Sequence, residues 1–313
     1  MDEVIFDLDE FLENPALCTT LKLHSQNIDD TVAKKLAEEI RVNNSVRELR
    51  MCHNIITHLG VKAIAGGLSV NETLALLDLS YNNIGDKGAK ELALGLKHNN
   101  TLTYLDLSYS HIGALGVKQL VNALKINRSV VSLSLIDNIA YSKIEETLMA
   151  KELSGLLKTN ECLTSLYLGG NNIGDAGAKE LALGLKHNNT LTYLDLSYNH
   201  IGTLGVKELS KALKINRCLT SLQLGGNNNI KNESIKELAE MLKVNQCIVN
   251  LDLHSSGMEY KTTKLLSEAL KINNSLAELY LCYSEVRDLG AKVLSDMLKT
   301  NCSLTLLSLE DTF

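Results

Sequence analysis

One apolar pattern, L-x-x-L-x-L-x-x-N-x-I, recurs with substitutions along the whole of this 313-residue chain. The steps between successive copies are 28 or 29 residues, apart from one of 33. The first position of the pattern falls at Cys18, Val46, Leu74, Leu102, Val130, Leu163, Leu191, Leu219, Ile248, Leu276 and Leu304. A fixed period of this length predicts small units that bury their apolar faces only by stacking on one another. We therefore expect ten full repeats and a terminal strand.

Each unit combines two periodicities. In residues 102–107, Leu105 and Leu107 alternate with polar residues, which indicates a half-buried strand. In residues 89–96, Ala and Leu recur at helical spacing, which indicates a helix with one buried face. Asp86 stands just before this segment and is expected to cap that helix. The repeat is therefore predicted to be a strand followed by a helix.

The pattern and its 28-residue period resemble the leucine-rich repeat family, in its ribonuclease-inhibitor-like class, over residues 18–313. Strands stack at ~4.8 Å and helices at roughly 8–10 Å, so the helical side must fan out. We expect an α/β solenoid in the form of a horseshoe, with a parallel β-sheet on the concave face and α-helices on the convex face.

Two features of the turns carry predictions. Serine replaces the asparagine of the pattern at three places, Ser110, Ser256 and Ser284, and each should weaken a ladder of buried asparagines. Glycosylation sequons begin at Asn71, Asn99 and Asn188, but they repeat with the turn itself and are interpreted as by-products of it.

Two irregularities interrupt the array. Residues 82–109 are nearly identical to residues 171–198, at an offset of 89, which equals three repeats (28, 28 and 33). A block of three repeats was therefore copied. The longer repeat carries five extra residues between Asp137 and Met149, around Tyr141. They are either a protruding loop or a helix that starts earlier.

The N-terminal segment differs from the repeats. Residues 1–17 hold six acids and no bases, together with the apolar residues Phe6, Leu8, Phe11 and Leu12. Repeat arrays need a polar cap over their first open core. We therefore divide the chain into an acidic N-terminal cap, residues 1–17, and a solenoid, residues 18–313. The sequence stops within the last strand, which leaves three possibilities. The sequence is a fragment, the C-terminal end is naturally short, or the exposed edge of this strand pairs with another chain.

Composition excludes several classes of function. A net charge of −6 argues against a nucleic-acid partner, and no apolar run approaches the ~20 residues that a membrane helix needs. The acidic N-terminus is unlike a secretory signal, and seven isolated Cys without a C-x-x-C pair argue against disulfides and zinc. A reducing, cytoplasmic setting is expected. No P-loop, H-E-x-x-H or G-x-S-x-G motif is present. We expect no enzyme, no cofactor and no metal.

The predicted concave face carries an unusual set of side chains. It is formed by positions 3, 5, 7 and 8 of each repeat, and eight of the ten Tyr fall there. Four Asp lie along position 5. Tyr is common at binding hot spots, although it also favours strands and belongs to the repeat's usual sequence. The predicted partner-binding residues are Asp78, Tyr81, Tyr104, Asp106, Tyr109, Tyr167, Tyr193, Asp195, Tyr198, Asp252, Tyr280 and Tyr283.

The family resemblance implies a non-enzymatic scaffold that holds a protein partner in its concave face. The Tyr/Asp mixture predicts a partner with Lys or Arg anchors. Over the N-terminal repeats, Lys22, Arg50 and His53 make the charge of the concave face basic instead. Positions on the same face lie close together, which predicts one patch of Tyr104, Asp106 and Tyr109 and a copy of it at Tyr193, Asp195 and Tyr198.

Three other functions stay open at this point. One is an activator of small GTPases of the same repeat class, although the acidic tail of those proteins is missing here. Another is the sensor part of an innate-immune receptor. The third is an effector similar to the leucine-rich-repeat proteins that intracellular bacteria such as Legionella deliver into the host cytosol.

Overall fold

The computed structural model describes residues 5, 6, 8–138 and 143–312, without the side chains of 5, 6, 9, 10, 12 and 143–146. Its contacts group the chain into two compact units. Unit 1 comprises residues 1–141 and 159–166, and unit 2 comprises residues 142–158 and 167–313. Strand β7 (Ser165–Tyr167) lies at their boundary. We describe each unit by itself.

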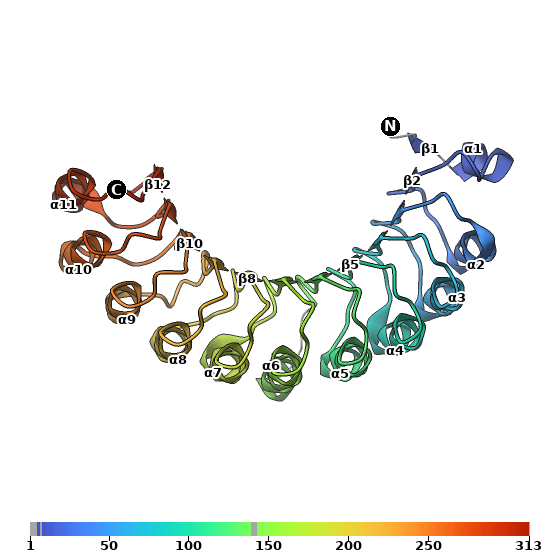
Figure 1. Cartoon of the computed structure of the whole chain (residues 1–313), viewed down its shortest axis with the longest axis horizontal. Coiled ribbons are helices and arrows are strands. Elements are labelled where there is room, and N and C mark those ends of the chain that lie inside the picture. The colour runs from blue at the N-terminus through green and yellow to red at the C-terminus, as the bar shows by residue number, and fades with distance from the viewer. Residues whose placement is uncertain (1–4, 7, 139–142, 313) are drawn as a thin grey trace. The chain divides into compact units, whose positions relative to one another are not determined.

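Unit 1 alternates short strands with helices. Its strands are β1 (Ile5–Phe6), β2 (Thr20–Lys22), β3 (Glu48–Arg50), β4 (Leu76–Asp78), β5 (Tyr104–Asp106) and β6 (Ser132–Ser134). Its helices are α1 (Leu8–Glu13), α2 (Asp30–Val42), α3 (His58–Leu68), α4 (Gly85–Leu96) and α5 (Ala114–Leu124). Neighbouring strands pair in parallel and in chain order. In Figure 1, α2–α5 lie on the outer side of this unit and its strands on the inner side.

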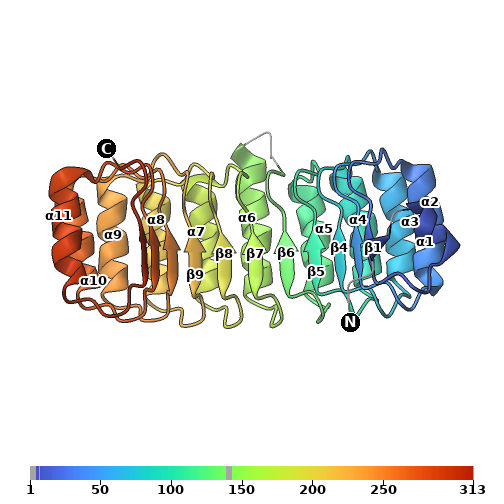
Figure 2. The ribbon, with the colours of Figure 1, turned by 90° about the horizontal axis from the view of Figure 1, so that it is seen from above.

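Unit 2 has the same plan. Its helices are α6 (Lys143–Leu157), α7 (Gly174–Leu185), α8 (Thr203–Leu213), α9 (Asn232–Leu242), α10 (Tyr260–Leu270) and α11 (Arg287–Leu298). Its strands are β8 (Tyr193–Asp195), β9 (Ser221–Gln223), β10 (Asn250–Asp252), β11 (Glu278–Tyr280) and β12 (Leu306–Ser308). These strands are parallel as well, side by side in front of their helices (Figure 2). The predicted alternation of parallel strands and outer helices is confirmed.

The core repeats with the sequence. Leu102, Leu105 and Leu107 of one repeat are all 0% exposed, as are Leu92 and Leu96 of the preceding helix. Within each unit, neighbouring helices pack on one another and neighbouring strands lie side by side. Because such sites are closely packed, truncating one of these leucines to alanine costs about 2–5 kcal/mol.

Two parts of the predicted plan touch residues that the structure leaves out. Phe11 is fully buried, as a cap residue should be, but the side chains of Phe6 and Leu12 lie outside the described residues. Of the insertion, residues 139–142 with Tyr141 lie outside the described part, and the residues from Lys143 onward belong to α6, which has 15 residues. The cap and the protruding loop stay predictions, and the described part of the insertion lengthens a helix.

A ladder of asparagine side chains ties each turn to the repeat before it. The Asn82 Nδ2 donates to the Met51 carbonyl at 2.9 Å, and its Oδ1 accepts from the Ile56 N–H at 3.0 Å. Ser110 keeps the first link, since its Oγ donates to the Leu79 carbonyl at 3.3 Å. No N–H of the described residues donates to that hydroxyl, so the serine retains half of the tie.

A second asparagine row contains the sequons. Asn71, Asn99 and Asn188 are at most 4% exposed. Each Nδ2 donates to a carbonyl 31 residues earlier, at 2.7–2.9 Å. A glycan on this buried nitrogen would have no room and would take one of its two donor hydrogens, which agrees with their interpretation as by-products of the turn.

The predicted cap of α4 is wrong. The Asp86 carboxylate does not bond its own helix; its Oδ1 accepts from Gly113 N–H and Gly116 N–H, both at 2.8 Å, and so caps α5 in the next repeat. The reason is that Asp86 lies inside the first turn of α4, and its side chain projects onto the neighbouring helix. A Cβ on Gly116 would lie 2.6 Å from the same oxygen, so only glycine admits this approach.

The same device recurs at α3 and α8. At the start of α8, Asp175 accepts from Gly202 N–H at 2.7 Å and Gly205 N–H at 2.8 Å. At the start of α3, Asp30 accepts from Thr57 N–H at 2.8 Å, the Thr57 hydroxyl at 2.6 Å and Gly60 N–H at 2.8 Å. Burial raises the pKa of Asp30, but these hydrogen bonds outweigh it and the net pKa is lowered.

We predict that Asp30→Ala lowers the free energy of unfolding by about 1–2 kcal/mol, because Thr57 N–H, the Thr57 hydroxyl and Gly60 N–H at the start of α3 lose their acceptor. Urea denaturation followed by circular dichroism measures this. Because the folded-state pKa of Asp30 is lowered, its contribution is present above about pH 4 and is lost as pH falls through the folded value. The difference between the two proteins should shrink accordingly.

The matched control is Asp288→Ala. Asp288 holds the equivalent place in the first turn of α11, and none of the described residues donates a hydrogen bond to it. We expect a change within about 0.5 kcal/mol. Equal losses in both variants would contradict capping across repeats.

Candidate functional site

The predicted binding residues fall into two rows. Positions 3 and 5 lie on the strands themselves, and we name them the strand row. Position 8 follows each strand, and we name it the turn row. Every turn-row residue has a φ between 49° and 71°, in the left-handed region. They are Ser25, His53, Tyr81, Tyr109, Asp137, Gly170, Tyr198, Gly226, Ser255, Tyr283 and Asp311.

Tyrosine is an unfavourable choice for the turn row. Only glycine adopts positive φ without steric cost, and two repeats do use it, at Gly170 and Gly226. Four repeats hold Tyr instead, and their exposures are 41%, 38%, 61% and 62% for Tyr81, Tyr109, Tyr198 and Tyr283. These rings therefore gain little from burial to offset the strain. Strain that folding does not require is typical of functional positions.

In unit 1 the turn row forms an aromatic column. The rings of His53 and Tyr81 stack at 3.9 Å and 14°, and those of Tyr81 and Tyr109 at 4.0 Å and 11°. Hydrogen bonds with Asp137 and then Tyr81 raise the pKa of the Tyr109 phenol far above its usual value. The column borders a shallow groove of about 590 Å³, which Ile55 also lines.

The charge of the strand row in unit 1 changes from positive to negative along the sheet. Arg50 lies opposite Asp78, and Asp78 opposite Asp106. Arg50 is paired with Glu48 of its own strand at 2.9 Å, which reduces the predicted basic character there. Burial is the main cause that raises the pKa of Asp106.

Only part of the predicted patch in unit 1 comes together. The Tyr104 hydroxyl donates to Asp106 at 3.3 Å, as expected. The observed contacts of Tyr109 are instead with Tyr81 and Asp137 of the turn row. The patch fails to include Tyr109 because a residue at positive φ leaves the line of the strand.

The copied residues in unit 2 have different partners. Tyr193 packs on Tyr167 with ring centres 4.8 Å apart, and burial together with Asp195 and Tyr167 raises the pKa of Tyr193 to about 12. Its counterpart Tyr104 bonds a carboxylate instead. An identical segment thus acquires different contacts, because the neighbouring repeats supply them.

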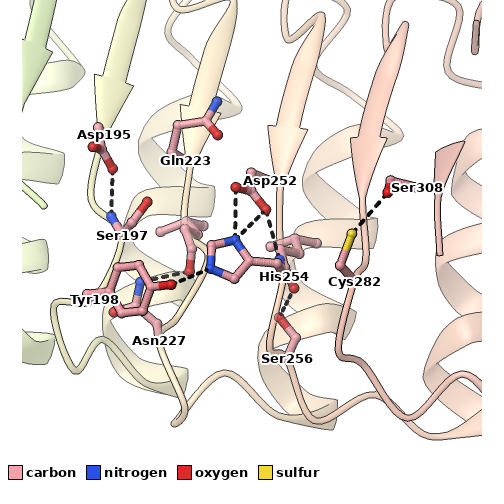
Figure 3. Close-up of polar contacts among 12 residues, drawn as sticks. Asp195, Ser197, Tyr198, Gln223, Asn227, Asp252, His254, Ser256, Cys282 and Ser308 are labelled. Atoms are coloured by element: carbon pink, nitrogen blue, oxygen red, sulfur yellow. Dashed lines mark hydrogen bonds and ion pairs between the residues drawn. The ribbon is translucent and has the colours of Figure 1, made fainter. Parts of the chain in front are cut away.

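Tyr198, His254 and Asp252 form a cluster that joins two repeats over the one between them (Figure 3). The His254 Nδ1 lies 3.0 Å from both oxygens of Asp252, and its Nε2 lies 3.1 Å from the Tyr198 hydroxyl. A carboxylate only accepts, so a neutral His254 carries its proton on Nδ1 and accepts from Tyr198 at Nε2. We call this the His254 cluster.

Two glycines make the His254 cluster possible. Tyr198 and His254 come from repeats on either side of Gly225 and Gly226. A Cβ on Gly225 would lie 1.8 Å from His254 Nδ1, and one on Gly226 would lie 2.4 Å from the Tyr198 ring. The intervening repeat thus needs glycine for close approach, and Gly226 also for its φ of 69°.

The remaining predicted residues lie at the C-terminal strands. The Tyr280 hydroxyl donates to Glu278 at 3.1 Å, which raises the pKa of Tyr280. Asp311 raises the pKa of the exposed Tyr283. His254 and Gln223 also occupy concave positions, but neither is a Tyr or an Asp, so the Tyr/Asp pattern did not predict them as site residues.

The described residues offer no metal site. No group of three or more His, Cys, Asp and Glu side chains among them could hold an ion. All seven Cys are unpaired, and burial raises the pKa of Cys18 to about 11. No helix in the described part of the chain combines the length and the apolarity needed to cross a bilayer.

Comparison with known proteins identifies the repeat. A family model described as leucine-rich repeat matches residues 70–93, 98–121, 159–182, 187–210 and 216–239. The chain is built from leucine-rich repeats. The framework Leu and Asn positions described above are therefore those of this family, and the stacked repeats are its solenoid.

Two solved structures show similar folds. The leucine-rich repeat-containing protein LegL7 from Legionella pneumophila has a TM-score of 0.54 and 20% identity, over 97% of this chain and 89% of that chain. Actin-binding site 2 of leiomodin-1 has a TM-score of 0.39 and 23% identity, over 48% of this chain and 86% of that one. The first likeness establishes the fold alone, and the second is too partial to support an argument. No curated protein sequence matches the chain.

We predict that Gly225→Ala dismantles the His254 cluster and leaves the leucine-rich repeat fold intact. The new Cβ would meet the end of a flexible side chain, so His254 rotates away and the backbone stays. Long-range ¹H–¹⁵N spectra of the imidazole should show the Nδ1–H tautomer in the wild type and a mixture of tautomers in the variant.

Gly169→Ala is the matched control. Gly169 occupies the same position of another Gly-Gly repeat, but its Cβ would come no closer than 3.3 Å to a neighbour, the Asp195 Oδ2. We expect the His254 signals of this variant to match the wild type. Unchanged signals in the Gly225 variant would show that the cluster does not depend on this clearance.

Proposed function

We propose that this protein is a non-enzymatic scaffold that binds a protein partner through the Tyr- and Asp-rich face of its repeats. The observation that carries the proposal is the turn row. Tyr81, Tyr109, Tyr198 and Tyr283 are exposed, at positive φ, where glycine serves equally well for folding. Tyrosine offers a rigid apolar surface with a polar tip, at a low entropic cost of ordering.

Charge supports a partner with basic anchors. Among concave positions from Tyr167 to Asp311, the sequence holds no Lys or Arg. The same positions hold five carboxylates, Asp195, Asp252, Glu278, Glu310 and Asp311. In unit 1, Asp78 and Asp106 make the later repeats acidic, whereas Lys22 and Arg50 make the first two repeats basic. Complementary charge on the partner speeds association and fixes its orientation.

A role as a bacterial effector stays a prediction. It rests on the regular repeats and on the copied block of residues 82–109 and 171–198, and the likeness to LegL7 at 20% identity concerns the fold. A GTPase activator and a receptor sensor remain the alternative functions, and no side-chain arrangement among the described residues favours either of them.

The test replaces all four turn-row tyrosines by glycine. Glycine relieves the strain of positive φ, but it also adds freedom to the unfolded chain and removes the ring stacking, so we expect the quadruple variant to stay folded and to melt near the wild-type temperature. Quantitative pull-down from cytosolic lysate should find proteins that the wild type captures and the variant captures at least about tenfold less, a loss of about 1.4 kcal/mol or more.

The control removes exposed apolar groups elsewhere. Leu115 and Leu204 are 69% and 67% exposed near the starts of α5 and α8. Replacing both by Ser should leave capture unchanged. The proposal fails if the glycine variant stays folded and captures the same proteins as the wild type, or if the Leu115 and Leu204 variant loses them instead.

A further inference from the structure

The strand row of unit 2 contains a line of three side chains on adjacent strands. Asp195 of β8 lies opposite Gln223 of β9, and Gln223 lies opposite Asp252 of β10. All three are half-buried. Since neighbouring strands are ~4.8 Å apart, the line is about 10 Å long. Figure 3 shows Gln223 between the two carboxylates. We name these residues the acceptor line.

The orientation of the Gln223 amide is determined by its neighbours. Its Nε2 lies 2.8 Å from Asn250 Oδ1 and 3.0 Å from Ser221 Oγ. The Asn250 Nδ2 in turn lies 2.6 Å from Glu278 Oε2. An ionised carboxylate accepts only, so Asn250 must present its NH₂ to Glu278 and its oxygen to Gln223. Both amide hydrogens of Gln223 are therefore used, and its Oε1 is the group left for a ligand.

The two carboxylates add only acceptors to this line. The Asp195 Oδ1 accepts from Ser197 N–H at 2.8 Å. The Asp252 Oδ1 accepts from His254 N–H at 2.9 Å, and both oxygens contact the His254 ring. No Lys or Arg occupies a concave position between Tyr167 and Asp311. A ligand for this face must therefore bring donors and positive charge.

We propose that unit 2 docks an arginine side chain of its protein partner on the acceptor line of Asp195, Gln223 and Asp252. The inference rests on the proposed function and names the anchor that this function requires. Guanidinium has five N–H donors in a planar fork and no acceptor, so it meets carboxylate and amide oxygens on neighbouring strands together. The ammonium of lysine is a compact, strongly hydrated point charge that cannot present such a fork.

An aromatic wall flanks the line. The Tyr198 ring is 61% exposed, and its hydroxyl is held 3.1 Å from His254 Nε2. Arginine stacks on such rings more readily than lysine does. Because the His254 cluster fixes the ring before binding, little side-chain entropy is lost when the guanidinium arrives.

The test uses three small probes on the ¹⁵N-labelled full chain, read by NMR. They are the N-acetyl amides of arginine, lysine and citrulline, the last being the neutral isostere of arginine. We expect saturable shifts of the Gln223 side-chain amide with the arginine probe, at least about fivefold weaker binding of lysine, and no binding of citrulline. No saturation by arginine up to about 20 mM, or equal binding of any two probes, would overturn the proposal.

The copied block supplies the matched variants. Asp195→Asn keeps an oxygen for Ser197 N–H and removes the charge, and we expect it to weaken arginine binding about fivefold to tenfold. Asp106→Asn changes the duplicate aspartate within the same Leu-Asp-Leu-Ser-Tyr sequence of unit 1, and should leave arginine binding at Gln223 unchanged. Equal effects of both variants would contradict the assignment to unit 2.

The two proposals fail in different ways. If the turn-row variant loses a captured protein but the arginine probe does not bind, the scaffold function stands and the arginine anchor is wrong. If the probe binds but no captured protein depends on the turn row, the anchor stands and the proposed scaffold function is wrong.

Discussion

Each repeat completes the hydrogen bonding of its neighbour, and the rest of the structure depends on this. A three-residue strand and a helix of three turns cannot bury an apolar face alone. Stacking supplies the apolar contacts, but it also buries turns full of backbone N–H and C=O groups. Asn82 bonds Met51 and Ile56 of the preceding repeat and Leu79 of its own, and Asp86 satisfies N–H groups of the next helix. Neither tie is local in sequence.

This explains why the fold could be predicted from the sequence and one cap could not. The strand alternation and the helical spacing are properties of a single repeat, and both survive in the structure. The role of Asp86 is a property of two repeats. The sequence of one repeat predicts that Asp86 caps the helix of its own repeat. In the structure its carboxylate accepts from the N–H groups of Gly113 and Gly116, 27 and 30 residues further on, at the start of α5. Ser110 shows the same limit, since the half of the tie that it keeps depends on where its hydroxyl points.

In the candidate site, too, contacts between repeats could not be predicted from the sequence of one repeat. The sequence locates the concave positions, because these follow from strand alternation. It does not determine what touches what, as the copied block demonstrates. Tyr104 bonds Asp106, whereas its duplicate Tyr193 packs on Tyr167. Tyr109 joins a column of stacked rings, whereas its duplicate Tyr198 reaches His254 over two glycines. The repeat determines where a side chain lies on the concave face, and the neighbouring repeats determine what that side chain contacts.

Glycine has two structural roles on this face that the composition alone does not predict. At Gly170 and Gly226 it relieves the strain of positive φ, and at Gly225 it also makes room for a side chain from the next repeat. A turn row made wholly of glycine would fold with less strain, yet it would have no aromatic column and no His254 cluster. The tyrosines and the glycines are therefore complementary parts of one arrangement. Gly225 and Gly226 clear the space in which a neighbouring aromatic ring is held, and in the proposed function a ring that is already in place lowers the entropic cost of binding a partner.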